Sequence, residues 1–105
     1  MDYKNRSLNV FGTKYQIKFV DRIRPNEENN LTYGECDSTR RTISISLKDT
    51  DNKPIPDNIV KTSLLHEVIH AILNEGQYSG ASSDEPMVEL LAKCFMDIIY
   101  KQKLI

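Results

Sequence analysis

The stretch that decides the fold lies in the second half of the chain and reads Leu64-Leu65-His66-Glu67-Val68-Ile69-His70-Ala71-Ile72. Its apolar residues recur at steps of three and four, the spacing of one face of an α-helix; they are Leu65, Val68, Ile69 and Ile72. The pattern predicts a helix that begins at Asp57 as its N-cap and runs through Leu73. Gly76 follows as a natural C-cap.

A second helix is predicted after a small polar connector over residues 78–83. It opens at Ser83 or, more naturally, with Asp84 as its cap, and it has Pro86 in its first turn, where a missing N–H costs little. Its apolar positions, predicted to be buried, are Val88, Leu91, Phe95 and Ile98 or Ile99.

The first half of the chain has the alternation of strands. Tyr15, Ile17 and Phe19 alternate with polar residues, and an incoming strand over residues 8–11 reaches them through a turn at Gly12-Thr13. After a polar loop over residues 24–30, segments 31–36 and 42–47 predict an antiparallel hairpin. Because strands come first and helices last, we expect one α+β domain over residues 1–105, with a small antiparallel sheet of three to four strands followed by two packed helices.

Composition narrows the function classes. The chain has 105 residues, 39% of them hydrophobic, and 14 Lys and Arg against 15 Asp and Glu. This balance offers no basic field for nucleic acid, and no apolar run suits a signal peptide or a membrane span. We expect a cytoplasmic protein without nucleic-acid or membrane partners. Cys36 and Cys94 lie far apart without a paired motif, which favours two reduced thiols.

His66 and His70 are the only histidines of the chain, and with Glu67 they form an H-E-x-x-H motif. Residues four apart on a helix share one face, so both imidazoles can reach one metal ion. Glu67 stands beside them, where it can take a proton from a water that the metal activates. The motif predicts a zinc site in which His66 and His70 are ligands and Glu67 is the catalytic base.

A catalytic zinc also needs a third protein ligand, and the second predicted helix offers Glu85 and Glu89. They are four residues apart on one face, so one can bind the metal while the other accepts the free ring N–H of a liganding histidine. We expect Glu85 as the ligand and Glu89 in the orienting role, with the reverse assignment as the alternative.

Two other interpretations of the motif compete with a catalytic zinc. His66 and His70 can simply belong to a solvated helix face on which Glu67 is an i,i+3 interaction partner. A structural zinc would need four protein ligands, and Cys36 or Cys94 would have to complete it without the closely spaced cysteine pairs usual in such sites.

The two segments 64–72 and 84–92 resemble the small gluzincin-type zinc metallopeptidases, and more narrowly the short phage and mobile-element proteins distantly related to the ImmA/IrrE group. The resemblance is strong from Thr62 to Phe95. It implies a minimal zincin-like catalytic domain in which His66, His70 and Glu85 hold Zn²⁺ and Glu67 is the general base. We expect a domain without the larger C-terminal subdomain of full-size gluzincins.

The motif and the resemblance together predict a zinc-dependent metallopeptidase that acts on a peptide or protein substrate. The alternative is a metal-binding or protein-binding module of a phage or mobile element that cleaves nothing efficiently; a zinc hydrolase of another bond is a third possibility.

Tyr33 and Tyr78 are candidates to stabilise the oxyanion. Cys36 could block the metal, although a core thiol is the simpler interpretation. The strand 42–47, with Ser44 or Ser46 facing solvent, is the candidate rim for an extended substrate.

Overall fold

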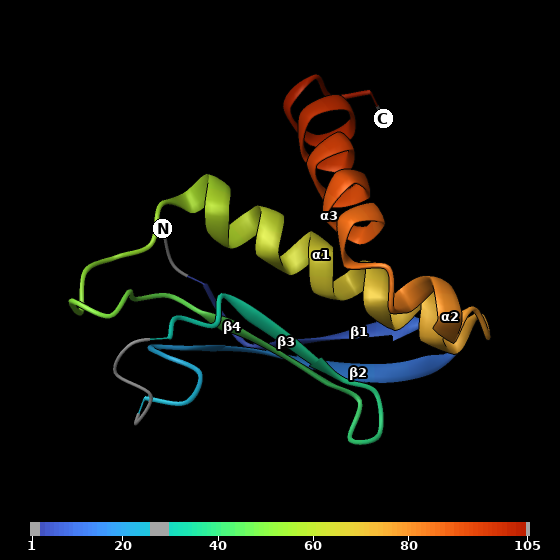
Figure 1. The fold of residues 1–105 in the computed structure, drawn as a ribbon, viewed down its shortest axis with the longest axis horizontal. Helices are drawn as coiled ribbons and strands as arrows, with labels where there is room; N and C mark the ends of the chain where they lie inside the picture. Colours follow the sequence, from blue (N-terminus) through green and yellow to red (C-terminus); the bar gives the residue numbers. More distant parts are fainter. Residues whose placement is uncertain (1–2, 26–29, 105) are drawn as a thin grey trace.

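A computed structural model describes residues 3–25 and 30–104. Its strands are β1 (Arg6–Val10), β2 (Thr13–Val20), β3 (Gly34–Asp37) and β4 (Thr42–Ser46), and its helices are α1 (Asp57–Glu75), α2 (Ser79–Ser82), α3 (Glu85–Cys94) and the π-helical η1 (Phe95–Lys101). The sheet forms one layer, α1 lies across it, and α3 with η1 rises away from both (Figure 1). The predicted α+β class is confirmed. Residues 26–29 of the predicted loop lie outside the described residues.

The sheet is mixed, so the expectation of a purely antiparallel sheet is wrong. Its strand order is β1-β2-β4-β3. β1 pairs with β2 and β3 pairs with β4 in antiparallel fashion, as the sequence predicts, but β2 and β4 run parallel. The hairpin of β3 and β4 therefore docks on β2 through its second strand and leaves its first strand at the edge.

The composition of the two strands explains which of them is central. Ile43 and Ile45 of β4 are fully buried, and Ser46 is buried too. β3 reads Gly-Glu-Cys-Asp and is only half-buried along its length. A parallel pair needs cover on both faces, which suits the apolar strand, whereas charged residues are at home on an edge. β3 also begins at Gly34, later than the predicted start at residue 31.

The first hairpin turns one residue earlier than predicted, at Phe11 and Gly12. Val10 pairs with Thr13, which leaves a two-residue loop. Both loop residues have positive φ, 50° at Phe11 and 84° at Gly12. This conformation suits the right-handed twist of the flanking strands, and glycine adopts it without strain.

Helix α1 covers the sheet through a cluster of buried side chains. The fully buried members of this core are Tyr15, Ile43, Ile45, Val60 and Ala71. The Tyr15 hydroxyl also donates to Glu75 at 2.8 Å, which ties β2 to the last turn of the helix. Gly76 is the C-cap, as predicted, and its N–H bonds to the Ile72 carbonyl at 2.8 Å.

The start of α1 differs from the prediction. Pro56 is the N-cap, Asp57 is the first helical residue, and no side chain caps the helix. The Asp57 carboxylate instead accepts a hydrogen bond from the Tyr3 hydroxyl at 2.8 Å. Asp57 remains favourable in the first turn because its charge opposes the positive end of the helix dipole.

Helix α3 packs on the other side of α1 and begins as predicted. Asp84 caps it by accepting from the Met87 N–H at 3.2 Å, and Pro86 lies in the first turn. Val88 and Ala92 are fully buried against Ile69. Between the two helices, the connector over 78–83 contains the one-turn helix α2.

Three apolar positions expected in the core are exposed instead: Ile72, Phe95 and Ile98. Helical periodicity predicts which residues share a face but not whether another element covers it. The segment of α3 and η1 rises away from the sheet (Figure 1), and Phe95 and Ile98 are exposed although Met96 between them is buried. None of the helices in residues 3–25 and 30–104 has the length and apolarity that a membrane crossing requires.

We predict that Ile43→Ala lowers the free energy of unfolding by about 2–5 kcal/mol, because it opens a cavity at a fully buried position of the central strand. Urea denaturation followed by circular dichroism measures the change. The control is Leu90→Ala on the exposed side of α3, for which we expect a change within about 0.5 kcal/mol. Equal effects of the two substitutions would contradict the central position of β4.

Candidate metal centre

The two histidines of α1 and the first glutamate of α3 meet at one point. The Nε2 atoms of His66 and His70 lie 3.2 Å apart. One carboxylate oxygen of Glu85 is 2.9 Å from His66 Nε2, and the other is 3.0 Å from His70 Nε2. The predicted trio His66, His70 and Glu85 is thus brought together from two helices, with candidate ligand atoms all within 4.8 Å of one another.

The distances suit a tetrahedral metal ion. Two ligand atoms at about 2.0–2.1 Å from a tetrahedral zinc lie about 3.3–3.4 Å apart, which is close to the separation of the two Nε2 atoms. Two imidazoles and one carboxylate are also a donor set that zinc prefers. The residues therefore fit a zinc ion with one coordination position left open.

The outer nitrogen of each histidine has a partner of its own. His66 Nδ1 lies 2.7 Å from a Glu89 oxygen, so Nδ1 carries the hydrogen and donates it to the carboxylate. His70 Nδ1 lies 2.9 Å from the hydroxyl of Ser82, which is buried in α2. A partner at Nδ1 orients the ring and leaves the Nε2 lone pair of His66 directed at the common point.

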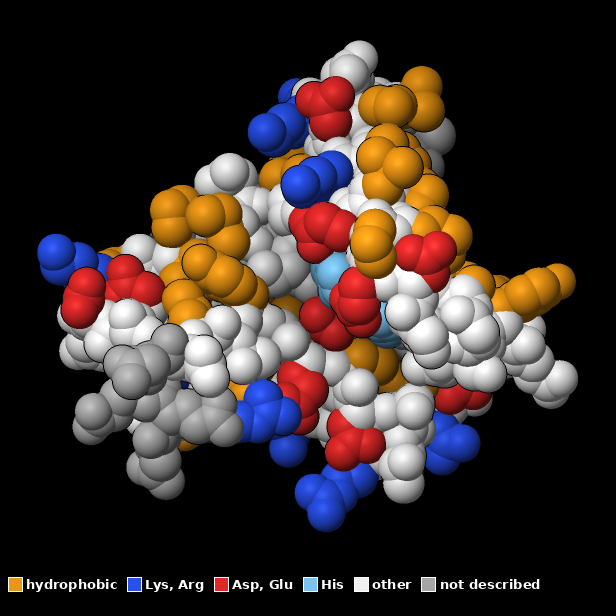
Figure 2. All heavy atoms as spheres, viewed as in Figure 1, with side chains coloured by type: hydrophobic (Ala, Val, Ile, Leu, Met, Phe, Trp, Pro, Cys, Tyr) orange, Lys and Arg blue, Asp and Glu red, His pale blue; other side chains and the backbone are white. Residues whose placement is uncertain are grey.

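These contacts assign different positions to the two glutamates. Glu85 faces both Nε2 atoms, whereas Glu89 bonds to an outer nitrogen. The arrangement favours Glu85 as the ligand and Glu89 as the orienting residue. Acidic side chains surround the histidines on this face of the molecule (Figure 2). Such a field attracts a cation.

Glu67 lies beside the histidines but is buried, with 8% of its surface exposed. Burial raises the pKa of its carboxyl to about 7; nearby carboxylates add to this shift and His66 opposes it. A carboxyl group with a pKa near neutrality can both accept and release a proton in neutral solution. A cation bound at the histidines would lower this pKa again.

The edge strand leaves room for Glu67 only because of Gly34. A Cβ atom at Gly34 would lie 2.9 Å from Glu67 Cγ, 3.0 Å from Glu67 Oε2 and 3.1 Å from Ile45 Cδ1. Side chains essentially never approach so closely. Gly34 therefore allows β3 to pass directly over the carboxylate.

Two open cavities meet at this point. One of about 380 Å³ is lined by Cys36, Glu67, His70 and Glu85, among others. The other, of about 660 Å³, extends along α1 and includes Tyr33, Gly34 and Lys93. Tyr33 therefore lies beside the candidate centre, whereas Tyr78 is among the lining residues of neither cavity.

Cys36 is near the site but outside the converging trio. Both cysteines are free thiols and half-buried. Burial raises the pKa of Cys36 to about 12, and the negative charge of Glu67 contributes to the shift. Cys36 belongs to β3, where its side chain packs against the core cluster and also lines the smaller cavity beside the trio.

The predicted substrate rim at strand 42–47 is wrong. β4 is a central strand whose backbone pairs with β2 on one side and β3 on the other. Ser46 is buried, and its hydroxyl donates to the Thr32 carbonyl at 2.7 Å. Ser44 is half-buried. The free edge beside the candidate centre belongs to β3.

Sequence reasoning missed Ser82 and Gly34. Ser82 lies in the connector, where small polar residues are usual and none announces a contact with a histidine twelve residues earlier. Gly34 is the first residue of the short charged strand β3, and a glycine within a strand can mark a close approach of another group. The glycine was visible in the sequence, but it does not indicate that the approaching group is Glu67.

We predict that Gly34→Ala destabilises the fold by about 1–3 kcal/mol, since the added methyl group displaces Glu67 or β3. The matched control is Gly80→Ala in α2, where a Cβ meets nothing within 4 Å. We expect no loss there and a gain of up to about 1 kcal/mol from helix propensity. Thermal unfolding of both variants compares them; a tolerated Gly34→Ala would contradict the close packing.

Comparison with known proteins adds no relative to this picture. A scan against family models, a search of curated proteins and a search of solved structures each find no match to the chain.

Proposed function

We propose that this protein is a zinc-dependent hydrolase that cleaves peptide bonds. The observation that carries the proposal is the convergence of His66 Nε2, His70 Nε2 and the Glu85 carboxylate next to the buried carboxyl of Glu67. A metal site with only a structural role needs no buried proton acceptor beside it. The unusual environment of Glu67 therefore supports an enzyme over a binding module.

His66, His70 and Glu85 would hold the zinc, which supplies a Lewis acid that activates water and polarises a carbonyl. Glu67 accepts the proton that the attacking water loses and delivers it to the departing amine. Glu89 and Ser82 keep the two imidazoles in orientation through their Nδ1 atoms. Tyr33 lines the neighbouring cavity, and we propose its hydroxyl as the donor of a hydrogen bond to the developing oxyanion.

A peptide substrate is favoured by the edge strand. β3 is the last strand of the sheet, and it passes over Glu67 at Gly34. An extended peptide can pair with such an edge and so bring its own backbone to the metal centre.

Metal content tests the centre. We expect about one zinc per chain in protein purified without chelator, lost in His70→Ala and retained in Glu67→Gln. Glu89→Gln should weaken zinc binding about 10–100-fold, the usual effect of removing a partner that orients a ligand, and Glu85→Gln should weaken it more. Elemental analysis and competition with a chromogenic chelator measure both effects. A larger loss in Glu89→Gln than in Glu85→Gln would reverse the two assignments.

Zinc should also stabilise the fold, because its ligands come from two different helices. At a free zinc concentration of about 100 times the Kd, the free energy of unfolding should rise by about 2.7 kcal/mol. Denaturation with zinc and with excess chelator measures the difference. His70→Ala should show no such difference, and a wild type that is equally insensitive would contradict the site.

Cleavage of a diverse peptide mixture tests the activity. We expect products with the zinc-loaded wild type and a rate about 10²–10⁴-fold lower with Glu67→Gln at the same zinc content. Mass spectrometry identifies the cleaved bonds. Full zinc occupancy without any cleavage of peptides or unfolded proteins would contradict the peptidase proposal and favour the metal-binding module.

A further inference from the structure

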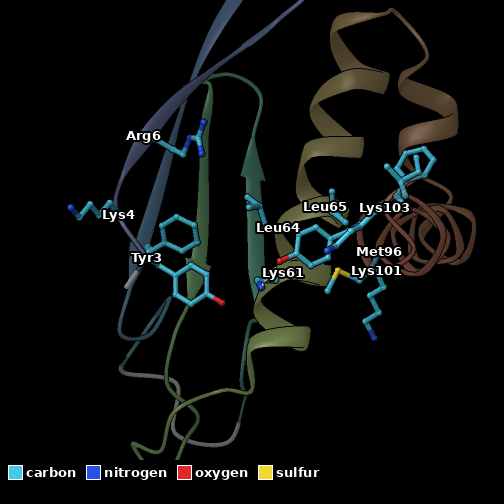
Figure 3. Close-up of a pocket in the computed structure, with 13 residues that line it drawn as sticks. Tyr3, Lys4, Arg6, Lys61, Leu64, Leu65, Met96, Lys101 and Lys103 are labelled. Atoms are coloured by element: carbon cyan, nitrogen blue, oxygen red, sulfur yellow. Dashed lines mark hydrogen bonds between the residues drawn. The ribbon is translucent and has the colours of Figure 1, made fainter. Parts of the chain in front are cut away.

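A second concave surface lies on the opposite side of α1 from the histidines. It is a groove of about 1320 Å³ between the N-terminal segment and η1, with α1 as its floor. In Figure 3, Tyr3, Lys4 and Arg6 stand on one wall and Met96, Lys101 and Lys103 on the other. Lys61, Leu64 and Leu65 of α1 lie between them. We call this surface the basic groove.

The basic groove combines an apolar base with one sign of charge. Its apolar and aromatic lining residues are Tyr3, Phe19, Leu64, Leu65, Phe95, Met96, Ile99 and Tyr100. Its charged lining residues are Lys4, Arg6, Lys61, Lys101 and Lys103, and no acidic residue is among them. The whole chain has slightly more acids than bases, so this concentration of cations is local.

The cations of the groove differ in their contacts with the described residues. Lys61 is engaged, because its Nζ donates to the Tyr100 hydroxyl at 2.8 Å and lies 4.8 Å from the ring centre. Within the described part of the chain, none of Lys4, Arg6, Lys101 and Lys103 forms an ion pair. Unpaired cations around an apolar surface would be satisfied by a ligand that brings both carboxylates and apolar groups.

The basic groove is separate from the metal centre. At about 100° per residue, Lys61, Leu64 and Leu65 point away from the side of α1 that carries His66 and His70. The two surfaces also share no lining residue. Occupation of one therefore leaves the other accessible.

The shape of the groove selects among acidic partners. Its volume exceeds the roughly 300–1,000 Å³ usual for small-molecule pockets. A lipid bilayer is flat and would reach the rim without filling the concave base. A peptide segment can place apolar side chains in the base and direct acidic side chains to cations on both walls.

We propose that the basic groove binds an acidic peptide segment of a partner protein, with apolar residues seated between α1 and η1 and Asp or Glu residues at Arg6 and Lys103. The contact does not depend on the metal centre. It gives the protein a second recognition surface of opposite charge to the acidic surroundings of the histidines.

The test uses a fluorescein-labelled peptide that alternates pairs of Glu and Leu, beside a matched peptide in which every Glu is Lys. Fluorescence anisotropy should show binding of the acidic peptide only. The double variant Arg6→Glu/Lys103→Glu should weaken that binding about tenfold, because two exposed attractive charges become repulsive. The control Lys14→Glu on β2, an exposed cation outside the groove, should leave the affinity within about twofold.

Two further measurements do not depend on whether the double variant folds. Binding to the wild type should weaken as salt rises from about 0.05 M to about 0.5 M, as expected of exposed charge pairs. Glu67→Gln and His70→Ala should bind the acidic peptide as the wild type does. Equal binding of both peptides, or no binding of either, would overturn the proposal. Formation of a salt-sensitive dimer would also overturn it, because a second copy of the chain would then occupy the groove. Binding only to anionic vesicles would overturn it as well, because the occupant would then be a lipid surface.

Discussion

The contact between α1 and α3 is the interaction on which the candidate centre depends. Ile69 on α1 packs against Val88 and Ala92 on α3, and the latter two are fully buried. The three residues proposed as metal ligands stand on these two helices. This contact holds α3 against α1, and Glu85 precedes Val88 by less than one turn, so its carboxylate meets both imidazoles. A change in this packing would move the ligands relative to one another before it touched any of them.

The start of α3 is the second element of that geometry. Asp84 caps the helix, and the next residue is already Glu85, so the side chain that meets the histidines belongs to the first turn. The helix then carries Glu89 one turn further, against the outer nitrogen of His66. One helix end therefore supplies both the carboxylate that faces the two Nε2 atoms and the carboxylate that bonds to His66 Nδ1. The cap sets the register of both.

Local patterns were sufficient to predict the elements and the histidine face. The apolar spacing of α1, the cap at Asp84 and the four-residue spacings of the histidines and glutamates are all properties of short segments. Features that depend on contacts between distant segments could not be predicted from such local patterns. Whether β3 or β4 pairs with β2 depends on a comparison of two strands across a long loop, and the exposure of Phe95 and Ile98 depends on the tilt of a helix. Gly34 and Ser82 act through partners distant in sequence.

Different sides of helix α1 face three different surroundings. One side packs on the sheet through Val60 and Ala71, another presents His66 and His70 to α3, and a third forms the base of the basic groove through Lys61 and Leu65. The helix is only modestly amphipathic as a result. An ordinary surface helix has one apolar face and one polar face, whereas the sequence of α1 must suit three different faces.

The parallel pairing of β2 with β4 has a consequence for the order of folding. Ile17 and Ile43 are neighbours in the sheet but distant in sequence, whereas the two antiparallel hairpins and α1 are built from local contacts. Closing a long loop costs entropy before its contacts form, so the union of β2 with β4 should be a late and slow event. Since α1 packs on residues of both β2 and β4, its complete docking on the sheet requires that union.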